Sequence, residues 1–122
     1  ARRLRKQLGG GMRQVGILAA AGHHALDNNI SRLHEDHQRA FALATALRSI
    51  QNVHVDMDTV ETNMVYVDMP EDRKAGLRSY LAEKGLLISP AKKSFRLVTH
   101  KDIPEYAIEQ FADAVASYMR EH

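Results

Sequence analysis

The hydrophobic pattern of this chain alternates between a helical period and an extended period. Apolar residues recur three or four positions apart in five segments, which is the spacing of one helix face. These segments predict helices at residues 1–8, 13–26, 31–49, 70–84 and 102–119.

Three of the predicted helices carry an apolar stripe that we expect to be buried. In the third helix the stripe consists of Leu33, Ala40, Phe41, Ala44 and Leu47. In the fourth it consists of Leu77, Tyr80 and Leu81, and in the last of Ile108, Phe111, Val115, Tyr118 and Met119.

The ends of these helices carry capping and stop signals. Ser31 is suited to cap the third helix, because its hydroxyl can accept a backbone hydrogen bond. Pro70 fits the first turn of the fourth helix, and Gly85 fits the position just after its end. Asp102 and Glu105 have the spacing of a capping box, which predicts that the last helix begins there.

Four shorter segments have the pattern of strands. Residues 53–57 alternate between apolar and polar, as in a half-buried strand. Residues 64–67, 86–88 and 95–99 are short apolar runs. The pattern predicts an α/β fold: a small, mostly antiparallel sheet of three or four strands, covered by helices on one face. A long N-terminal helix, residues 13–26, connects to it.

The helix at residues 13–26 is unusual in its composition. Residues 15–22 are too apolar and too small-sided for a surface segment. We expect this helix to be buried, with Gly16, Ala20 and Ala21 allowing close packing against another element. It stands apart from the predicted sheet, so we expect its partner to belong to a neighbouring domain.

Length and composition limit the class of protein. At 122 residues the chain is one domain at most, and 44% hydrophobic content is ordinary for a globular protein. Cysteine is absent, which excludes a disulfide scaffold and a cysteine-zinc site and suits a cytosolic protein. No apolar run is long enough for a membrane span, and no signal peptide is visible.

Positive charge is concentrated at the start of the chain. Arg2, Arg3, Arg5, Lys6 and Arg13 fall within the first thirteen residues, with no acidic residue among them. A basic arm can bind nucleic acid or a membrane surface. Here no aromatic residues are interleaved and no recognition motif accompanies the charges, so we expect neither partner.

A run of three glycines follows this basic helix. Gly9, Gly10 and Gly11 precede Arg13 and then the apolar helix. A glycine turn and a cation before a helix can hold an anion at the helix N-terminus. The pattern is neither GxGxxG nor a P-loop, and a flexible hinge leading into a core helix is an equal interpretation.

Arg96 is the most informative charged residue of the predicted strands. It lies between Phe95 and Leu97, and strand alternation places it on one face with Val98 and His100. A guanidinium presents a fork of donors that matches a carboxylate, which indicates a substrate-carboxylate clamp. The alternative is an edge-strand arginine with its head in solvent.

Seven histidines raise the question of a metal site. His34 and His37 are three residues apart, but HExxH is absent and no third ligand is suggested, so we expect no metal. At most one of His23 and His24 can face a core, as a hydrogen-bonded packing residue. His100, just after the Arg96 strand, is a weaker site candidate.

No complete catalytic arrangement is visible. The serines lack the GxSxG context of a nucleophile elbow. Lys6, Lys92 and Lys93 could attack a carbonyl only if desolvation lowered their pKa, and none lies in an apolar run. The chain by itself therefore does not have the pattern of a complete catalyst.

Together these motifs resemble a known family. The Gly-Gly-Gly-Met-Arg-Gln run at residues 9–14, with the small-residue helix after it, resembles the segment that follows the cofactor-binding lysine in low-specificity L-threonine aldolases. The strand and turn at residues 95–103 are a second match, and residues 61–63 are a third. The similarity extends over essentially the whole chain.

The resemblance implies a fold-type-I pyridoxal-phosphate enzyme that is homotetrameric and cytoplasmic. It implies cleavage of L-threonine and L-allo-threonine to glycine and acetaldehyde, with the cofactor as electron sink. Arg96 matches the arginine that binds the substrate carboxylate in this family. Lys6 and Arg13 match basic residues near the active-site entrance and the cofactor phosphate.

The resemblance also implies a division of the chain. Residues 1–30 would be the end of the large-domain region with the interdomain helix, and residues 31–122 the C-terminal small domain. The Schiff-base lysine of the family has no match here, so we expect the chain alone to be inactive. Two alternatives stay open: the small domain of another fold-type-I pyridoxal-phosphate lyase acting on β-hydroxy or β-substituted amino acids, and a basic nucleic-acid-binding module.

Overall fold

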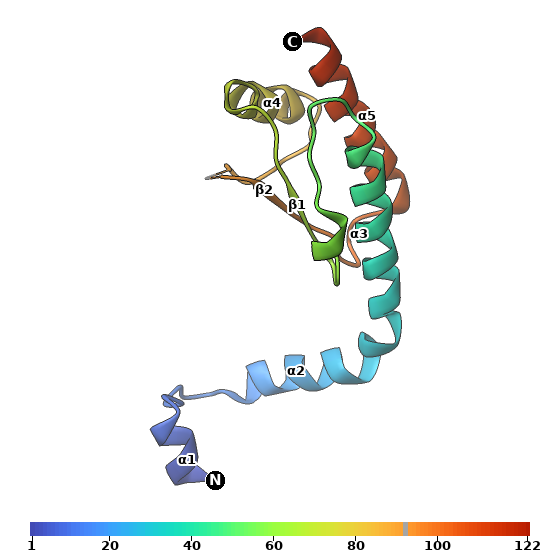
Figure 1. Cartoon of the computed structure of the whole chain (residues 1–122). Coiled ribbons are helices and arrows are strands. Elements are labelled where there is room, and N and C mark those ends of the chain that lie inside the picture. The colour runs from blue at the N-terminus through green and yellow to red at the C-terminus, as the bar shows by residue number, and fades with distance from the viewer. Residues whose placement is uncertain (92) are drawn as a thin grey trace. The chain divides into compact units, whose positions relative to one another are not determined.

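The computed structural model of this chain describes residues 1–91 and 93–122. Within them the chain divides into two compact units, Ala1–Leu33 and His34–His122. The first unit contains α1 (Arg2–Gln7), α2 (Gly16–Asn28) and the 3₁₀ turn η1 (Ile30–Arg32). From the unit boundary onward follow α3 (Leu33–Arg48), the 3₁₀ turn η2 (Met57–Thr59), β1 (Met64–Val67), α4 (Glu71–Glu83), β2 (Phe95–Val98) and α5 (Glu105–Glu121) (Figure 1).

The glycine run ends α1. The N–H groups of Gly9 and Gly10 donate to the carbonyls of Lys6 and Arg5, over 3.1 and 2.7 Å. This pair of bonds is a Schellman motif, and Gly9 has the positive φ of +83° that the motif requires. A side chain at Gly10 would collide with Arg5. The first two glycines therefore have a structural role at the end of the helix.

Helix 13–26, which we expect to pack against a neighbouring domain, is exposed within the described chain. The helix begins at Gly16, two residues after Gln14, which has a positive φ of 49°. None of its residues is buried, and Ile17 is 79% exposed. Apolar composition shows that a helix favours an apolar partner but does not say which segment provides it. No other element of this unit covers the helix.

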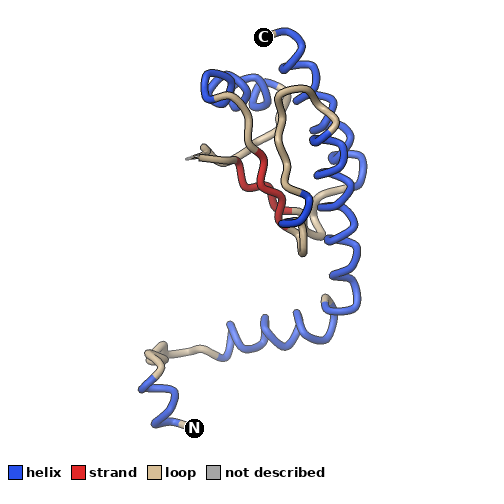
Figure 2. The backbone as a smooth tube through the Cα atoms, in the orientation of Figure 1, coloured by secondary structure: helices blue, strands red, loops and turns tan. Residues whose placement is uncertain are grey.

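The second unit is built on an antiparallel pair of strands. β1 and β2 pair with Val65 opposite Leu97 and Tyr66 opposite Arg96. The two strands are drawn in red in Figure 2. Val65 is fully buried, whereas Tyr66 is 45% exposed, so one face of the sheet is buried and the other is exposed. The predicted small α/β class is confirmed, although the described residues form two strands and not three or four.

The predicted strand at residues 53–57 is only partly correct. Val53 and Val55 are buried while His54 is exposed, as the alternation requires. Ladder pairing is limited to one bridge, in which His54 and Asp68 exchange bonds of 2.8 and 2.9 Å. The Asp56 carboxylate then accepts from the backbone N–H of Asp58, which caps η2 and ends the extended segment.

The predicted strand at residues 86–88 is wrong. Gly85, with φ of +75°, ends α4 as predicted, and the N–H of Leu86 donates to the carbonyl of Leu81 over 2.9 Å. Leu87 is 85% exposed. The N–H of Leu86 thus completes the helix cap, and Pro90 has no N–H to give to a ladder. Too little chain remains between them for a paired strand.

The core lies between the sheet and three helices. Val65, Val67 and Phe95 form the buried face of the sheet. They share one cluster with side chains of α3, α4 and α5: Ala40, Leu43, Ala44, Leu47, Leu77, Leu81, Ile108, Val115 and Tyr118. The stripes predicted for the fourth and last helices are confirmed, with Tyr80, Phe111 and Met119 partly buried.

Two details of the predicted helices are wrong. In α3, Leu33 and Phe41 are exposed. Phe41 lies about 100° around the helix from buried Ala40, so its side chain points away from the core. The last helix begins at Glu105 after Pro104 and has no side-chain cap. Proline disfavours the helical conformation in the residue before it, so the helix cannot begin at Asp102 as a capping box would require.

Candidate functional site

Arg96 lies on the exposed face of the sheet. Its neighbour Phe95 is 3% exposed and Thr99 is 2% exposed, whereas Arg96 and Val98 are exposed. The strand alternation predicted for this segment is therefore confirmed. The geometry places the guanidinium on the side of the sheet opposite the core.

The surroundings of Arg96 leave its donors available. Among the described residues, Arg96 takes part in no ion pair and no side-chain hydrogen bond. It borders a hollow of about 410 Å³ together with Leu87, Ser89 and Val98. An arginine fork with no competing acid can take a carboxylate through two parallel hydrogen bonds.

Lys6 and Arg13 lie in the first unit, and Arg96 lies in the second. Lys6 is in the last turn of α1, and Arg13 lies between the glycine turn and α2. Both side chains are exposed. Their positive charge suits a phosphate.

The described lysines differ in burial. Lys74 is buried, and its ammonium contacts Glu71 at 2.8 Å and Asp68 at 3.0 Å. It also donates to the main-chain carbonyl of Lys93. The hydrogen bond with Glu71, followed by that with Asp68, raises the pKa of Lys74 above its ordinary value of 10.5.

A raised pKa is the opposite of what covalent chemistry at a lysine requires, since only the neutral amine attacks a carbonyl. Of the lysines considered in the sequence, Lys6 and Lys93 are exposed, and Lys92 lies outside the described residues. The described lysines therefore do not fit the role of a covalent cofactor anchor.

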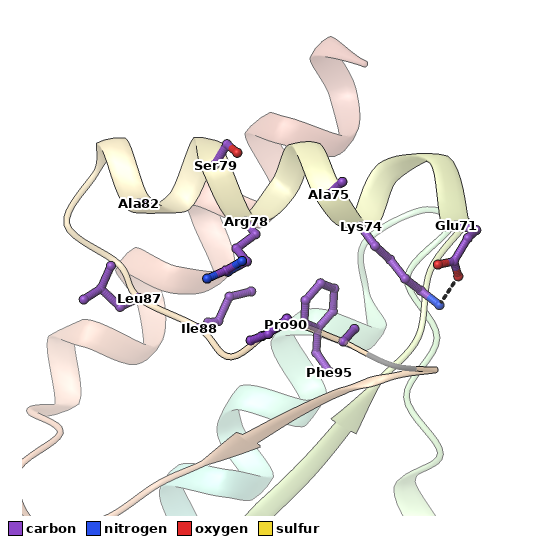
Figure 3. Close-up of a pocket in the computed structure, with 11 residues that line it drawn as sticks. Glu71, Lys74, Ala75, Arg78, Ser79, Ala82, Leu87, Ile88, Pro90 and Phe95 are labelled. Carbon is purple, nitrogen blue, oxygen red and sulfur yellow. Dashed lines mark hydrogen bonds and ion pairs between the residues drawn. The ribbon is translucent and has the colours of Figure 1, made fainter.

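A large hollow of the second unit lies beside α4. Its volume is about 680 Å³, and its lining includes Lys74, Arg78, Ile88, Pro90 and Phe95 (Figure 3). The Lys74–Glu71 ion pair lies at one end of it. The sequence analysis missed this pair, although a glutamate three residues before a lysine on a helix is a recognisable signal.

The histidines are distributed over both units. His24 is exposed on α2, near the side chain of Asn28 at 3.2 Å, so it is not a packing residue in this unit. His100 faces the Asp102 carboxylate at 3.7 Å. Within the described residues, no three potential metal ligands come together. In the same part of the chain, none of the helices combines the length and apolarity of a membrane span.

Comparison with known proteins gives a consistent result. The profile of the family described as "Beta-eliminating lyase" matches residues 1–70. The chain is 44% identical over 113 residues to the "Probable low-specificity L-threonine aldolase 2" of Arabidopsis thaliana, covering 89% of this chain and 32% of that protein.

Other relatives come from a bacterium and a fungus. Identity to the "Low specificity L-threonine aldolase" of Escherichia coli (strain K12) is 44% over 116 residues, which is 95% of this chain and 33% of that protein. Identity to the "Aldolase vrtJ" of Penicillium aethiopicum is 33% over 115 residues, covering 93% and 29%. The chain thus spans about a third of the length of the curated relatives it matches.

Proposed function

Because the chain belongs to the β-eliminating lyase family, we propose that it is part of a pyridoxal-phosphate-dependent aldolase that cleaves L-threonine and L-allo-threonine. The products are glycine and acetaldehyde. The 44% identity to threonine aldolases over most of the chain supports this reading. Residues 31–122 are the small domain in this proposal, and residues 1–30 join it to the rest of the enzyme.

Arg96 is the residue of this chain that binds the substrate. The observation that carries this role is an exposed guanidinium on the solvent face of β2, with no acidic partner among the described residues. Two parallel hydrogen bonds to the substrate carboxylate fix the orientation of the amino acid. An ordered substrate reacts faster because the entropy of alignment is lost on binding rather than in the chemical step.

Lys6 and Arg13 contribute positive charge to the cofactor phosphate. When it is bound, pyridoxal phosphate supplies an electron sink for the pair left at Cα when the Cα–Cβ bond breaks. The described lysines do not fit the covalent anchor, because Lys74 has a raised pKa and the others are exposed side chains. We therefore place the anchoring lysine in polypeptide beyond these residues, and we expect the 122-residue chain alone to be inactive.

The remaining properties follow from the same proposal. The active enzyme is a homotetramer of the cytoplasm, and its partners are an amino-acid substrate and its own copies. A second reaction class is favoured by the family description, which is that of a β-eliminating lyase. Such an enzyme would act on a β-substituted amino acid, expel the β-substituent, and form ammonia and a keto acid after hydrolysis, instead of glycine.

The test uses the longer protein that contains this chain. Arg96→Lys keeps the charge but loses the bidentate fork, so KM for L-threonine should rise sharply. Arg120→Lys is the matched control, because this exposed arginine lies on α5 and contacts Ser117. An unchanged KM for Arg96→Lys would remove the clamp assignment. Product analysis separates the two classes, since only the aldolase forms acetaldehyde.

A further inference from the structure

We infer that Tyr66 positions the Arg96 guanidinium for the carboxylate, an inference that rests on the proposed function. The two residues are direct partners across the strand pair. Both are exposed, on the face of the sheet away from the core. No charged or aromatic residue of β1 is closer in register to Arg96.

Tyr66 and Arg96 occupy a position in the antiparallel pairing where opposite side chains lie close together. The N–H of Thr99 donates to the carbonyl of Asn63 over 2.9 Å, so this pair is a hydrogen-bonded one. Bonded and non-bonded pairs alternate along an antiparallel ladder. Three pairs further on, Tyr66 and Arg96 therefore form a non-bonded pair. In such pairs the Cα atoms approach to about 4.5 Å and the side chains are closest.

A tyrosine beside the arginine can restrain it without occupying its donors. An aromatic ring can stack on the flat face of a guanidinium. The N–H groups at the edge of the guanidinium then remain available for a carboxylate. An acidic residue in the same position would pair with the arginine and compete with the substrate. Tyr66 is therefore suited to narrow the range of Arg96 orientations while keeping its charge available.

The carboxylate of Asp68, just after β1, is already engaged. Asp68 is two residues from Tyr66 and shares its face. Its carboxylate contacts Lys74 at 3.0 Å and accepts from the N–H of Met69 at 2.9 Å. Tyr66 and Asp68 border a hollow of about 200 Å³ together with His54, and Arg96 borders the separate hollow of about 410 Å³. The Asp68 carboxylate is thus engaged by Lys74, and Arg96 keeps no acidic partner among the described residues.

The test measures steady-state kinetics of the longer protein with L-threonine. We compare Tyr66→Phe, which keeps the ring, with Tyr66→Thr, which removes it but keeps a residue that favours strands. Tyr66→Thr should raise KM about fivefold with kcat changed less than about twofold, and Tyr66→Phe should restore KM to within about twofold. Tyr106→Thr, at an exposed position of α5, is the control for loss of a surface ring.

A double-mutant cycle gives the second readout. In the Arg96→Ala background, Tyr66→Thr should raise KM no further, because a positioning residue acts through the residue it positions. If the effects of Tyr66→Thr and Arg96→Ala on KM are additive, the inference is wrong. It is also wrong if Tyr66→Phe raises KM as much as Tyr66→Thr does. An unaltered KM in Tyr66→Thr while Arg96→Ala raises KM would also overturn it and leave the proposed function intact. If Arg96→Ala itself leaves KM unaltered, the proposed function fails. Circular dichroism of each variant verifies that the fold is retained.

Discussion

Asn63 and Thr99 are joined by hydrogen bonds in both directions, including one of 3.3 Å from the Thr99 hydroxyl to the carbonyl of Asn63. The N–H of Thr99 donates to the carbonyl of Asn63 over 2.9 Å, and the Asn63 amide donates to the carbonyl of Thr99 over 2.8 Å. The Thr99 hydroxyl donates in turn to the main-chain carbonyl of Asp36 over 2.7 Å. The end of β2 is thus joined to the start of β1 and to α3, three residues from Arg96.

Thr99→Val tests this junction. Valine has the shape of threonine but no hydroxyl, so the variant loses the buried hydrogen bond to Asp36 with little change in packing. We expect the free energy of unfolding to fall by about 1 kcal/mol, the usual net value of such a bond. Urea unfolding followed by circular dichroism measures it. Thr45→Val removes an exposed hydroxyl bonded to Phe41 and should change stability by less than about 0.5 kcal/mol.

Gly76→Ala tests the contact between α4 and α5. A Cβ at Gly76 would overlap the hydroxyl of Tyr118, which is 4% exposed and donates to the carbonyl of Arg73 over 3.0 Å. Alanine favours a helix over glycine by up to about 1 kcal/mol, but overpacking costs about 1–3 kcal/mol. We expect net destabilisation, measured as a lower thermal midpoint.

Two controls separate the overlap from the helix propensity. Gly22→Ala lies in α2, where a Cβ would meet no atom within 4 Å, so propensity alone should make α2 more stable. Gly76→Ala combined with Tyr118→Phe removes the overlapping oxygen, and the cost of alanine should then be smaller than in the single variant. Equal costs in both backgrounds would show that the Tyr118 hydroxyl is not the obstacle.

The carboxylate of Asp68 should make stability depend on pH in the acid range. The hydrogen bond from Lys74, and then that from the N–H of Met69, lowers the pKa of Asp68 below its ordinary 3.8. A lowered pKa in the folded state contributes stability above the unfolded pKa, and this stability is lost as the pH falls below 3.8. The carboxylate is 49% exposed, so the contribution is about 0.5 kcal/mol or less.

Unfolding in urea between pH 5 and pH 2 measures this dependence. Asp68→Asn cannot ionise, so the acid loss of stability should be shallower than in the parent protein. Asp72→Asn is the control, since this carboxylate is 75% exposed and 3.6 Å from Arg73. A curve for Asp68→Asn that matches the parent at every pH would contradict the role given to the Lys74 hydrogen bond.

Local chemistry determined which elements could be predicted. β1 and β2 are predictable because each places apolar side chains between polar turns, and Gly85 ends α4 because a positive φ favours glycine. Residues 86–88 have a similar apolar composition, but the N–H of Leu86 is taken by the helix cap. Such competition for one backbone group is a property of the folded chain and not of its pattern.

The candidate site likewise has features that the sequence pattern predicts and features that depend on the folded chain. Strand alternation was enough to place Arg96 on the exposed face, whereas its pairing with Tyr66 depends on the register between strands 30 residues apart in sequence. The ion pairs of Lys74 join α4 to Asp68 at the end of β1. Only Glu71, one turn earlier on the same helix, could have been linked to Lys74 from spacing alone.

Arg13 and Arg96 should affect different steps of binding in the longer protein. Arg13→Ala removes a positive charge that we propose contacts the cofactor phosphate. The dissociation constant of pyridoxal phosphate should therefore rise about three- to tenfold. The absorbance of the bound cofactor after dialysis measures this constant. Once the cofactor saturates, KM for L-threonine should return close to the parent value. Arg96→Ala should give the reverse: unaltered cofactor affinity and a raised KM. Arg2→Ala removes one positive charge from α1 and is the control for a nonspecific effect of charge on cofactor binding. If both arginines alter cofactor affinity equally, the separation of phosphate and carboxylate roles between them is wrong.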